Sequence, residues 1–235
     1  MYLKVADLTI FMDSYGRVME QAKPYEVEAV ENPDVIIRSE WEALKSKYPT
    51  LSDDDGEYLA TGKSFYQQLL QFDGFMLHSS AVVVDGKAYL FTAASGTGKS
   101  THTGLWLKQF GDRAYILNDD KPALRLIDGV WYAFGTPWSG KNDISVNTGV
   151  PVAGIAVLTR NENNEIEPFL GREAILTIFT QTNRKTNTVA HRAKLLELMD
   201  KLLRAVPVWK LKCNMEPEAA IVAYEAMSGR KFEEI

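Results

Sequence analysis

Residues Tyr89 to Leu107 read YLFTAASGTGKSTHTGLWL, and both a fold and a class of ligand can be predicted from this stretch. The apolar run from Ala88 to Phe91 predicts a buried strand, and the spacing of Leu105 and Phe110 predicts a helix. Small residues fill the segment between them, from Ala93 to Gly98. A strand, a small-residue loop and a Gly-Lys-Ser sequence that opens a helix form the layout of a phosphate-binding loop.

The composition of this loop suits the chemistry of a polyphosphate. Several backbone N–H donors must come close to the ligand, and only a loop with little side-chain bulk lets the backbone approach. The start of the helix adds unpaired N–H groups and the positive end of the helix dipole. We therefore expect a nucleotide to bind at Ser95, Gly96, Thr97, Gly98, Lys99, Ser100 and Thr101.

Two residues of the loop have predicted roles. Lys99 is expected to reach the β- and γ-phosphates, and the Ser100 hydroxyl is expected to ligate Mg²⁺. The alternative is a glycine-rich turn that only joins a strand to a helix. The first fixed position of the motif is usually Gly and is Ala93 here. Ala93 would be strained by about 1 kcal/mol if its φ is positive, and nothing is lost if its φ is negative.

The composition is that of an ordinary globular chain. Its 235 residues allow one large domain, or one domain with a small appendage. A net charge of −5 argues against nucleic acid as the main partner, because phosphate backbones need basic surfaces. No apolar run approaches the roughly 20 residues of a membrane span, so we expect no membrane segment. The single cysteine, Cys213, fits a reducing compartment and is expected to be a buried small hydrophobe. We expect a cytoplasmic protein.

Residues 1–50 predict a small β-rich segment, and residues 51–235 a larger domain. Short apolar runs separated by turn residues predict strands at Leu3–Val5, Leu8–Met12 and Val35–Ile37. The segment from Leu51 to Gly56 marks a boundary or a helix start. Its acidic run, Asp53 to Asp55, is expected to be a solvated loop, with a weak cation site as the alternative. Apolar residues between Tyr58 and Phe72 predict a helix.

The residue pattern of the larger domain predicts an α/β fold with a mixed sheet that contains hairpins. Asp85-Gly86 and Asp128-Gly129 are hairpin turn signals, and the first hairpin feeds the phosphate loop. Val152–Leu158 is expected to be a buried strand with Ile166–Phe169 as its hairpin partner. Further helices are expected at Ala174–Phe179, Val189–Val206 and Glu216–Met227, and a strand at Val208–Leu211.

Two adjacent carboxylates, Asp119 and Asp120, follow the short apolar strand Ala114–Leu117. Ligand sites of α/β proteins are built at the carboxyl ends of strands. One carboxylate of such a pair can serve a metal ion while its neighbour faces an incoming hydroxyl group. The alternative is a solvated turn that contains Asn118.

Other candidate residues are less specific. His78 ends a predicted strand and is either a structural residue or a catalytic one, in which case its side chain should point toward the loop and Asp119. His102 can approach phosphates but is expected at the surface. Lys141 and Trp138 either meet a ligand or are an exposed lysine and a packed rim residue.

Three segments between His78 and Lys121 resemble a known family. These segments are LHSSAVVVDGKAYLF, ASGTGKST and LNDDKPAL, in that order. They resemble the catalytic domain of the HPr serine kinase/phosphorylase family, which is related to the ATP-dependent phosphoenolpyruvate carboxykinases. The remainder resembles shorter HPr-kinase-like proteins, some of which accompany clusters for ribosomal peptide modification. The resemblance implies a phosphate loop carried on a compact mixed-sheet core.

The resemblance also implies roles for individual residues. His78 would lie at the active site beside the phosphates, and Asp119 would be the base toward an acceptor serine. Asp120 would hold Mg²⁺ together with Ser100. The chain departs from the family in one signature, E-[IV]-R-G-x-G, which nothing in the chain matches. That signature supports the phosphorylase reaction and contact with HPr, so the resemblance carries neither to this chain.

The sequence predicts a Mg-ATP-dependent kinase that transfers the γ-phosphate to a hydroxyl group. The expected cofactors are ATP and Mg²⁺, and the expected acceptor is a serine of a peptide or small protein. The alternative is a non-catalytic ATP-binding accessory or regulatory protein, for example in peptide modification. The identity of the acceptor, the choice of ATP over GTP and homo-oligomer formation are left open by the sequence.

Overall fold

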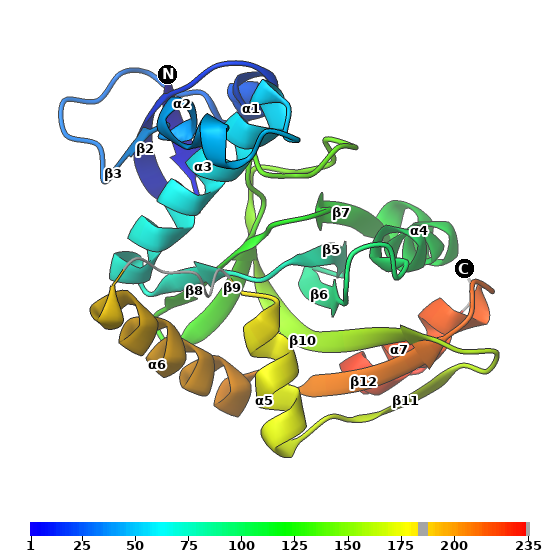
Figure 1. The fold of residues 1–235 in the computed structure, drawn as a ribbon. Coiled ribbons are helices and arrows are strands. Elements are labelled where there is room, and N and C mark those ends of the chain that lie inside the picture. The colour runs from blue at the N-terminus through cyan, green and yellow to red at the C-terminus, as the bar shows by residue number, and fades with distance from the viewer. Residues whose placement is uncertain (183–187, 234–235) are drawn as a thin grey trace.

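The computed structural model describes residues 1–182 and 188–233, and it shows a mixed α/β architecture (Figure 1). A three-stranded sheet at the N-terminus accompanies a large, curled nine-stranded sheet. The small sheet consists of β1 (Tyr2–Val5), β2 (Leu8–Asp13) and β3 (Val35–Arg38). The predicted mixed α/β class and the predicted N-terminal strands are therefore confirmed.

The large sheet has the strand order β4-β8-β9-β10-β6-β5-β7, with β12 beside β10 and β11 beside β12. Its strands are β4 (Gly74–Met76), β5 (Ser79–Val84), β6 (Lys87–Thr92), β7 (Ala114–Asn118), β8 (Ala123–Ile127), β9 (Val130–Phe134), β10 (Gly149–Arg160), β11 (Glu165–Pro168) and β12 (Val208–Cys213). Strand β10 runs parallel to β6 and to β12, and the other pairs of this sheet are antiparallel.

Both predicted hairpins are present. Val84 pairs with Lys87 across the first turn, and Ile127 pairs with Val130 across the second. All four residues of the two Asp-Gly turns have positive φ, as the tight hairpin turn requires.

The predicted partner of β10 is wrong. β11 pairs antiparallel with β12 rather than with β10. The long strand β10 already pairs with β6 along one side and with β12 along the other. The turn after β10 therefore carries the chain past β12, and β11 forms on its outer edge.

The helices after residue 50 lie close to the predicted positions, although the first of them begins at Asp53 rather than at Tyr58, and the two short helices within residues 1–50 were not predicted. The helices are α1 (Arg17–Ala22), α2 (Trp41–Leu44), α3 (Asp53–Gln68), α4 (Lys99–Phe110), α5 (Gly171–Thr180), α6 (Val189–Ala205) and α7 (Glu218–Ser228). Short 3₁₀ turns follow at Lys23–Tyr25, Lys45–Lys47, Leu69–Phe72 and Gly111–Arg113. Within the described residues, none of the helices is long and apolar enough to cross a membrane.

The acidic run Asp53 to Asp55 is not a solvated loop, and that expectation is wrong. These residues form the first turn of α3, where Ser52 caps the helix by accepting a hydrogen bond from the backbone N–H of Asp55 at 3.1 Å. Carboxylates are stabilised at this end of a helix by the unpaired N–H groups and the dipole. Asp53 also pairs with Lys45, and Asp55 with Arg17.

Helices cover both faces of the large sheet. Helices α5 and α6 pack on one face, against strand residues such as Leu90 and Ile155. Helices α4 and α7 pack on the other face, against Phe91 and Ala156. Alternate residues of the same strands thus point into two cores, as the pleat of a strand requires. The phosphate-loop helix α4 is therefore anchored by one of these cores.

A third core joins the N-terminal sheet to helix α3 and to strands β8 and β9. Gly56 lies on α3 where the buried ring of Trp41 comes so close that a Cβ atom would lie 2.1 Å from it. The N-terminal segment thus packs directly on α3. The domain boundary at residue 50 stays a prediction.

Replacing Gly56 by Ala should destabilise the protein even though Ala is the better helix former. Ala favours a helix by about 1 kcal/mol, whereas overpacking costs about 1–3 kcal/mol. We expect a net loss of about 1 kcal/mol, measured by urea denaturation. Gly104→Ala is the matched control, because Gly104 is also helical and a Cβ there has no neighbour within 4 Å. Gly104→Ala should be neutral or stabilising. Equal effects of the two changes would contradict the packing of Trp41 on α3.

Candidate functional site

The loop between β6 and α4 has the backbone that its small residues predict. Gly96 and Gly98 have φ values of 78° and 119°, a region that favours glycine. A Cβ on either would meet nothing within 4 Å, so the space beside the loop is open. Ala93 is not among the residues with positive φ, so the strain considered for this position does not arise.

Lys99 begins helix α4 and is almost fully buried, with 8% of its surface exposed. Its Nζ donates a hydrogen bond to the backbone carbonyl of Ala93 at 3.1 Å. Burial lowers the pKa of Lys99, and the nearby carboxylates of Asp120 and Asp119 partly oppose this shift. The ammonium group is thus a desolvated cation at the base of the loop, which an anionic ligand would stabilise.

Arg160 was not singled out by the sequence, and it holds the loop in place. Its guanidinium donates to the carbonyl of Thr97 at 2.9 Å and to that of Gly96 at 2.6 Å. Arg160 is the last residue of β10, which runs parallel to the loop-bearing strand β6. The sequence signal for Arg160 is a basic residue at the end of a long apolar strand. This signal points to the loop only once β10 is known to pair with β6, and local sequence patterns do not reveal that pairing.

A cavity of about 510 Å³ lies between the loop and the turn after β7. It is lined by His78, Ser95, Gly96, Gly98, Lys99, Ser100, Thr101, Asp119, Asp120, Ser139, Gly140, Lys141, Asn142 and Arg160. The structure therefore brings almost all predicted site residues together. Thr97 does not line this cavity, because its N–H and its hydroxyl both bond to the carbonyl of Ala94, at 3.3 and 2.8 Å.

Asn118 organises the turn that carries the two carboxylates. Its side chain is fully buried, and its Oδ1 accepts hydrogen bonds from the backbone N–H groups of Asp120 at 3.0 Å and Lys121 at 2.8 Å. Its Nδ2 donates to the carbonyl of Thr136 at 3.0 Å. The turn is thus fixed from within rather than solvated, as a short side chain bonding to the following backbone allows.

Asp119 is held by a chain of hydroxyl groups that starts on the loop helix. The Ser80 hydroxyl donates to Asp119 Oδ1 at 2.6 Å, since an ionised carboxylate can only accept. The Thr103 hydroxyl on α4 lies 2.8 Å from the Ser80 oxygen. Asn142 donates to the second oxygen of Asp119 at 3.3 Å. The position of Asp119 is therefore tied to that of the loop helix.

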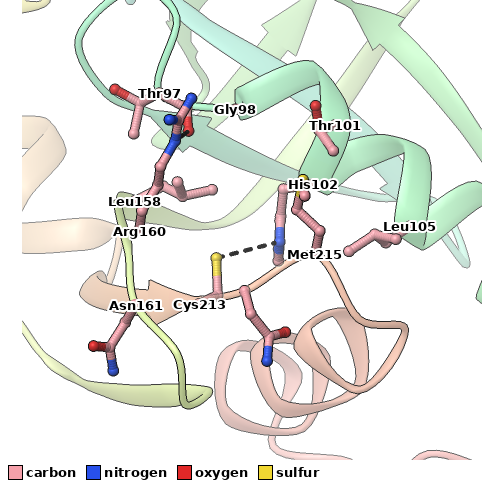
Figure 2. Close-up of a pocket in the computed structure, with 11 residues that line it drawn as sticks. Thr97, Gly98, Thr101, His102, Leu105, Leu158, Arg160, Asn161, Cys213 and Met215 are labelled. Carbon is pink, nitrogen blue, oxygen red and sulfur yellow. Dashed lines mark hydrogen bonds between the residues drawn. The ribbon is translucent and has the colours of Figure 1, made fainter.

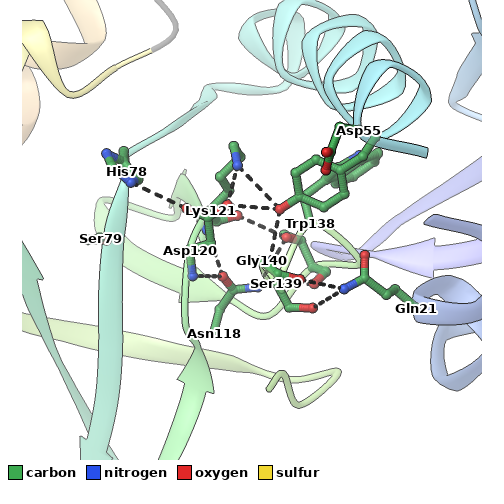
Figure 3. Close-up of polar contacts among 12 residues, drawn as sticks. Gln21, Asp55, His78, Ser79, Asn118, Asp120, Lys121, Trp138, Ser139 and Gly140 are labelled. Atoms are coloured by element: carbon green, nitrogen blue, oxygen red, sulfur yellow. Dashed lines mark hydrogen bonds and ion pairs between the residues drawn. The ribbon is translucent and has the colours of Figure 1, made fainter. Parts of the chain in front are cut away.

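Asp120 is surrounded by donors (Figure 3). Its Oδ2 accepts from the Tyr58 hydroxyl at 2.9 Å and pairs with the Lys121 ammonium, and its Oδ1 lies 3.3 Å from His78 Nε2. Burial alone would raise the pKa of Asp120, but the hydrogen bond from His78 and the charge and hydrogen bond of Lys121 outweigh it. The pKa therefore lies well below the ordinary range, and Asp120 stays ionised.

His78 lies in the cavity, but it contacts a different carboxylate from the one expected. Its Nε2 faces Asp120 rather than Asp119, and its Nδ1 lies 3.2 Å from Gln181 Oε1. His78 precedes β5, which runs antiparallel to β6, so the start of β5 lies beside the end of β6. This pairing places the imidazole at the loop's edge of the sheet.

Tyr58 connects helix α3 to the segment that borders the cavity. Its hydroxyl oxygen accepts from the backbone N–H of Gly140 at 2.9 Å while donating to Asp120. From helix α1, Gln21 donates to the carbonyl of Gly140 at 2.7 Å. The N-terminal segment thus positions one wall of the cavity. No sequence pattern pointed to Tyr58, because its partners lie more than sixty residues away.

The sequence left open whether Trp138 and Lys141 meet a ligand, and the structure gives a different answer for each residue. Trp138 is fully buried, stacks on Phe65 with a ring-centroid distance of 4.8 Å, and donates to the Thr61 hydroxyl at 3.2 Å. It is a core residue and does not face a ligand. Lys141 is exposed and lines the cavity.

His102 is buried, and the expectation of a surface position is wrong. Only 2% of it is exposed, and Trp106 donates to its Nε2 at 3.1 Å. The apolar contacts of α4 draw it inward, and burial lowers its pKa to about 4. Cys213 is buried as expected, with Sγ 3.8 Å from His102 Nδ1, and burial raises the pKa of its thiol to about 11.

The comparisons with known proteins agree with the motifs. A family model described as "SynChlorMet cassette protein ScmC" matches residues 59–218. No curated protein matches the sequence. Among solved structures, the chain is similar to the HPr(Ser) kinase/phosphatase from Coxiella burnetii, with 12% identity and a TM-score of 0.39 over 66% of this chain and 95% of that chain. The name of this solved structure is that of the family that the motifs resemble. At this identity and TM-score, the likeness says nothing about activity.

The buried imidazole of His102 should make stability depend on pH. The unfolded chain binds a proton at this residue below about pH 6.5, whereas the folded chain does so only near pH 4. The contribution of neutral His102 to stability is therefore complete above pH 6.5 and is lost as the pH falls toward 4. The slope can reach about 1.4 kcal/mol per pH unit. We expect His102→Gln to flatten the dependence of the free energy of unfolding between pH 6.5 and 4.5, measured by urea denaturation. Parallel curves for the two proteins would contradict the buried, neutral state.

Proposed function

The chain belongs to the ScmC family of SynChlorMet cassette proteins, and from its site we propose that it is a Mg-ATP-dependent kinase with an HPr-kinase-like phosphate-loop core. It transfers the γ-phosphate to a hydroxyl group, with a serine of a peptide or small protein as the acceptor. One observation carries the proposal. A desolvated lysine at a glycine-rich loop shares a single cavity with two carboxylates, one of which, Asp119, is tied to the same loop helix.

The loop suits the phosphates of a nucleotide. The backbone beside Gly96 and Gly98 is open to a ligand, and the N-terminus of α4 supplies unpaired N–H groups. Lys99 supplies a positive charge that is buried and is therefore poorly solvated by water. Lys141 and Arg160 add positive charge to the lining of the cavity. Fixed cations of this kind stabilise the charge that spreads over a transferring phosphoryl group.

The donor set also fits Mg²⁺, which prefers oxygen ligands from one or two carboxylates together with phosphate oxygens. The Ser100 hydroxyl and the Asp120 carboxylate line the same cavity. Asp120 stays ionised, as a metal ligand must. When bound, the ion neutralises phosphate charge and aligns the γ-phosphate. Lys121 and Tyr58 occupy Asp120 Oδ2, so Asp120 would have to release one of these partners to hold the ion through that oxygen.

Asp119 suits the role of base toward the acceptor. Its carboxylate is fixed through Ser80 and Thr103, and it lines the cavity next to the loop. In the proposed step, the acceptor hydroxyl oxygen forms a bond to the γ-phosphorus while the bond to the β-phosphate oxygen breaks. The hydroxyl proton passes to Asp119, and ADP leaves.

A non-catalytic ATP-binding accessory protein is the alternative, and one observation favours it. The carboxylate of Asp120 is paired with Lys121 rather than open to a metal ion. A protein with this ion pair could bind a nucleotide, and Asp120 and Lys121 would then exchange partners although no phosphate acceptor is present. The two candidates differ in whether labelled phosphate appears on an acceptor or ATP is only bound.

Replacing Lys99 by Met should remove most of the affinity for phosphates without unfolding the protein. The Met side chain has a similar length and tolerates burial, but it carries no charge for the β- and γ-phosphates. A charged hydrogen bond is worth about 1.5–3 kcal/mol, so affinity for Mg-ATP should fall about 10- to 100-fold, measured by calorimetry. The matched control is Lys108→Met, an exposed lysine on the same helix, which should bind as the parent does. Unchanged affinity in a folded Lys99→Met protein would rule out the phosphate loop.

Replacing Asp119 and replacing Asp120 should have different effects on nucleotide binding and on turnover. Asp120→Asn should weaken Mg-ATP binding, because a neutral amide is a poorer ligand for a hard cation. Asp119→Asn should bind Mg-ATP almost as the parent does but lose about 10²–10⁴-fold in turnover, because it cannot accept the hydroxyl proton. We would measure affinity by calorimetry and label transfer from γ-labelled ATP to serine-containing peptides. Full transfer by Asp119→Asn would remove the base mechanism, and equal losses of affinity would assign both carboxylates to the metal.

A further inference from the structure

A second cavity of about 510 Å³ is lined by the residues drawn in Figure 2, and it shares part of its wall with the phosphate cavity. Gly98, Thr101 and Arg160 line both cavities. The second cavity extends along the first two turns of α4, past His102 and Leu105, to the end of β12. A ligand held by its phosphates at Lys99 and Ser100 would therefore reach this second cavity over Gly98 and Thr101.

The second cavity differs from the first in chemistry. Leu105, Leu158 and Met215 line it with apolar surface. His102 and Cys213 lie at its base, and burial keeps both uncharged near neutral pH, since the imidazole pKa is lowered to about 4 and the thiol pKa is raised to about 11. The first cavity, in contrast, holds the carboxylates and Lys99. A flat, neutral and largely apolar group fits the second cavity better than a phosphate does.

We propose that the second cavity binds the base and ribose of the nucleotide whose phosphates occupy the first. This inference rests on the proposed nucleotide binding at the loop. Its volume lies within the roughly 300–1,000 Å³ of small-molecule sites, and apolar walls with a few polar groups are typical of them. Arg160 stands between the cavities, and its hydrogen bonds to the carbonyls of Gly96 and Thr97 fix the wall that both share.

The polar side chains of this cavity suggest that it holds a purine by shape rather than by reading its edge. The Asn214 amide donates to the carbonyl of Glu162 at 2.8 Å and accepts from the N–H of Glu216 at 3.0 Å. The Asn161 amide donates to the carbonyl of Asn163 at 3.0 Å. Strong discrimination between related ligands needs polar groups reserved for the ligand, and an apolar pocket alone discriminates weakly. We therefore expect ATP and GTP to bind with affinities within about tenfold of each other.

The first test compares ligands that contain or lack a nucleoside. Met215 lines the cavity yet is 75% exposed, so Met215→Ala removes apolar contact without disturbing a core. We expect Met215→Ala to weaken ATP and GTP binding by about 3- to 10-fold and to leave inorganic tripolyphosphate unchanged, by calorimetry. Leu170→Ala is the matched control, because Leu170 is 78% exposed and lies at the start of α5. It should leave all three affinities unchanged.

The second test locates the nucleoside. Cys213 is the chain's one cysteine and lines the second cavity, so alkylation by iodoacetamide at pH 9 reports directly on that cavity. Saturating ATP or adenosine should slow the alkylation at least about fivefold, whereas tripolyphosphate should not. A rate unchanged by ATP overturns the base site whatever Met215→Ala does, and so does a preference for ATP or GTP above about 100-fold.

The outcomes separate this inference from the function on which it rests. If tripolyphosphate binds and Lys99→Met abolishes that binding, but Cys213 is not protected by ATP, the phosphate loop stands and the base site fails. If neither ATP nor tripolyphosphate binds to the parent protein, the proposed function fails and the base site falls with it.

Discussion

The parallel pairing of β6 with β10 determines which strand ends meet at one edge of the large sheet. The loop leaves the end of β6, and Arg160 ends β10 beside it. Because β5 is antiparallel to both β6 and β7, its start and the end of β7 lie at that same edge. His78 and the two carboxylates are therefore gathered around the loop by strand direction alone. A change of direction in any of these strands would carry its polar residues to the opposite edge.

Burial of charge is the second theme of the site. Lys99, Asp120 and Lys121 are all largely withdrawn from water. A buried charge is costly unless partners surround it, and removing one partner leaves the other exposed to that cost. Lys121, Tyr58 and His78 supply these partners for Asp120. Lys99 donates a hydrogen bond to the backbone carbonyl of Ala93, and the carboxylates of Asp119 and Asp120 lie farther off, so its buried charge is only partly compensated. The arrangement keeps a preorganised positive charge beside the loop without a bound anion.

The sequence was sufficient wherever the signal is local. Asp85-Gly86 and Asp128-Gly129 each specify a hairpin through two residues, and the small residues before Lys99 identify the loop between β6 and α4. It was insufficient wherever distant segments decide. The partner of β11 depends on both sides of β10 being filled, and the burial of His102 depends on the packing of α4 against Phe91 of β6 and Cys213 of β12. Arg160 acquires its role only because β10 lies beside β6. A helix start was one of the two alternatives for Leu51–Gly56, and the cap at Ser52 decides it, because the carboxylates that follow are stabilised at that end of the helix.

The hydroxyl of Tyr58 links the N-terminal layer electrostatically to the edge of the large sheet that carries the loop. One oxygen atom bonds to Asp120 and to the backbone of Gly140, and it stands on a helix whose other neighbours are the small sheet and Trp41. A rotation of that helix would at once alter the field at Asp120 and loosen the segment that carries Lys141. A macromolecule that bound to the small sheet would thus be able to change the electrostatic environment of Asp120, which lies more than sixty residues from Tyr58 along the chain. Evolution can tune this coupling through the packing of the small sheet, without touching a residue of the cavity.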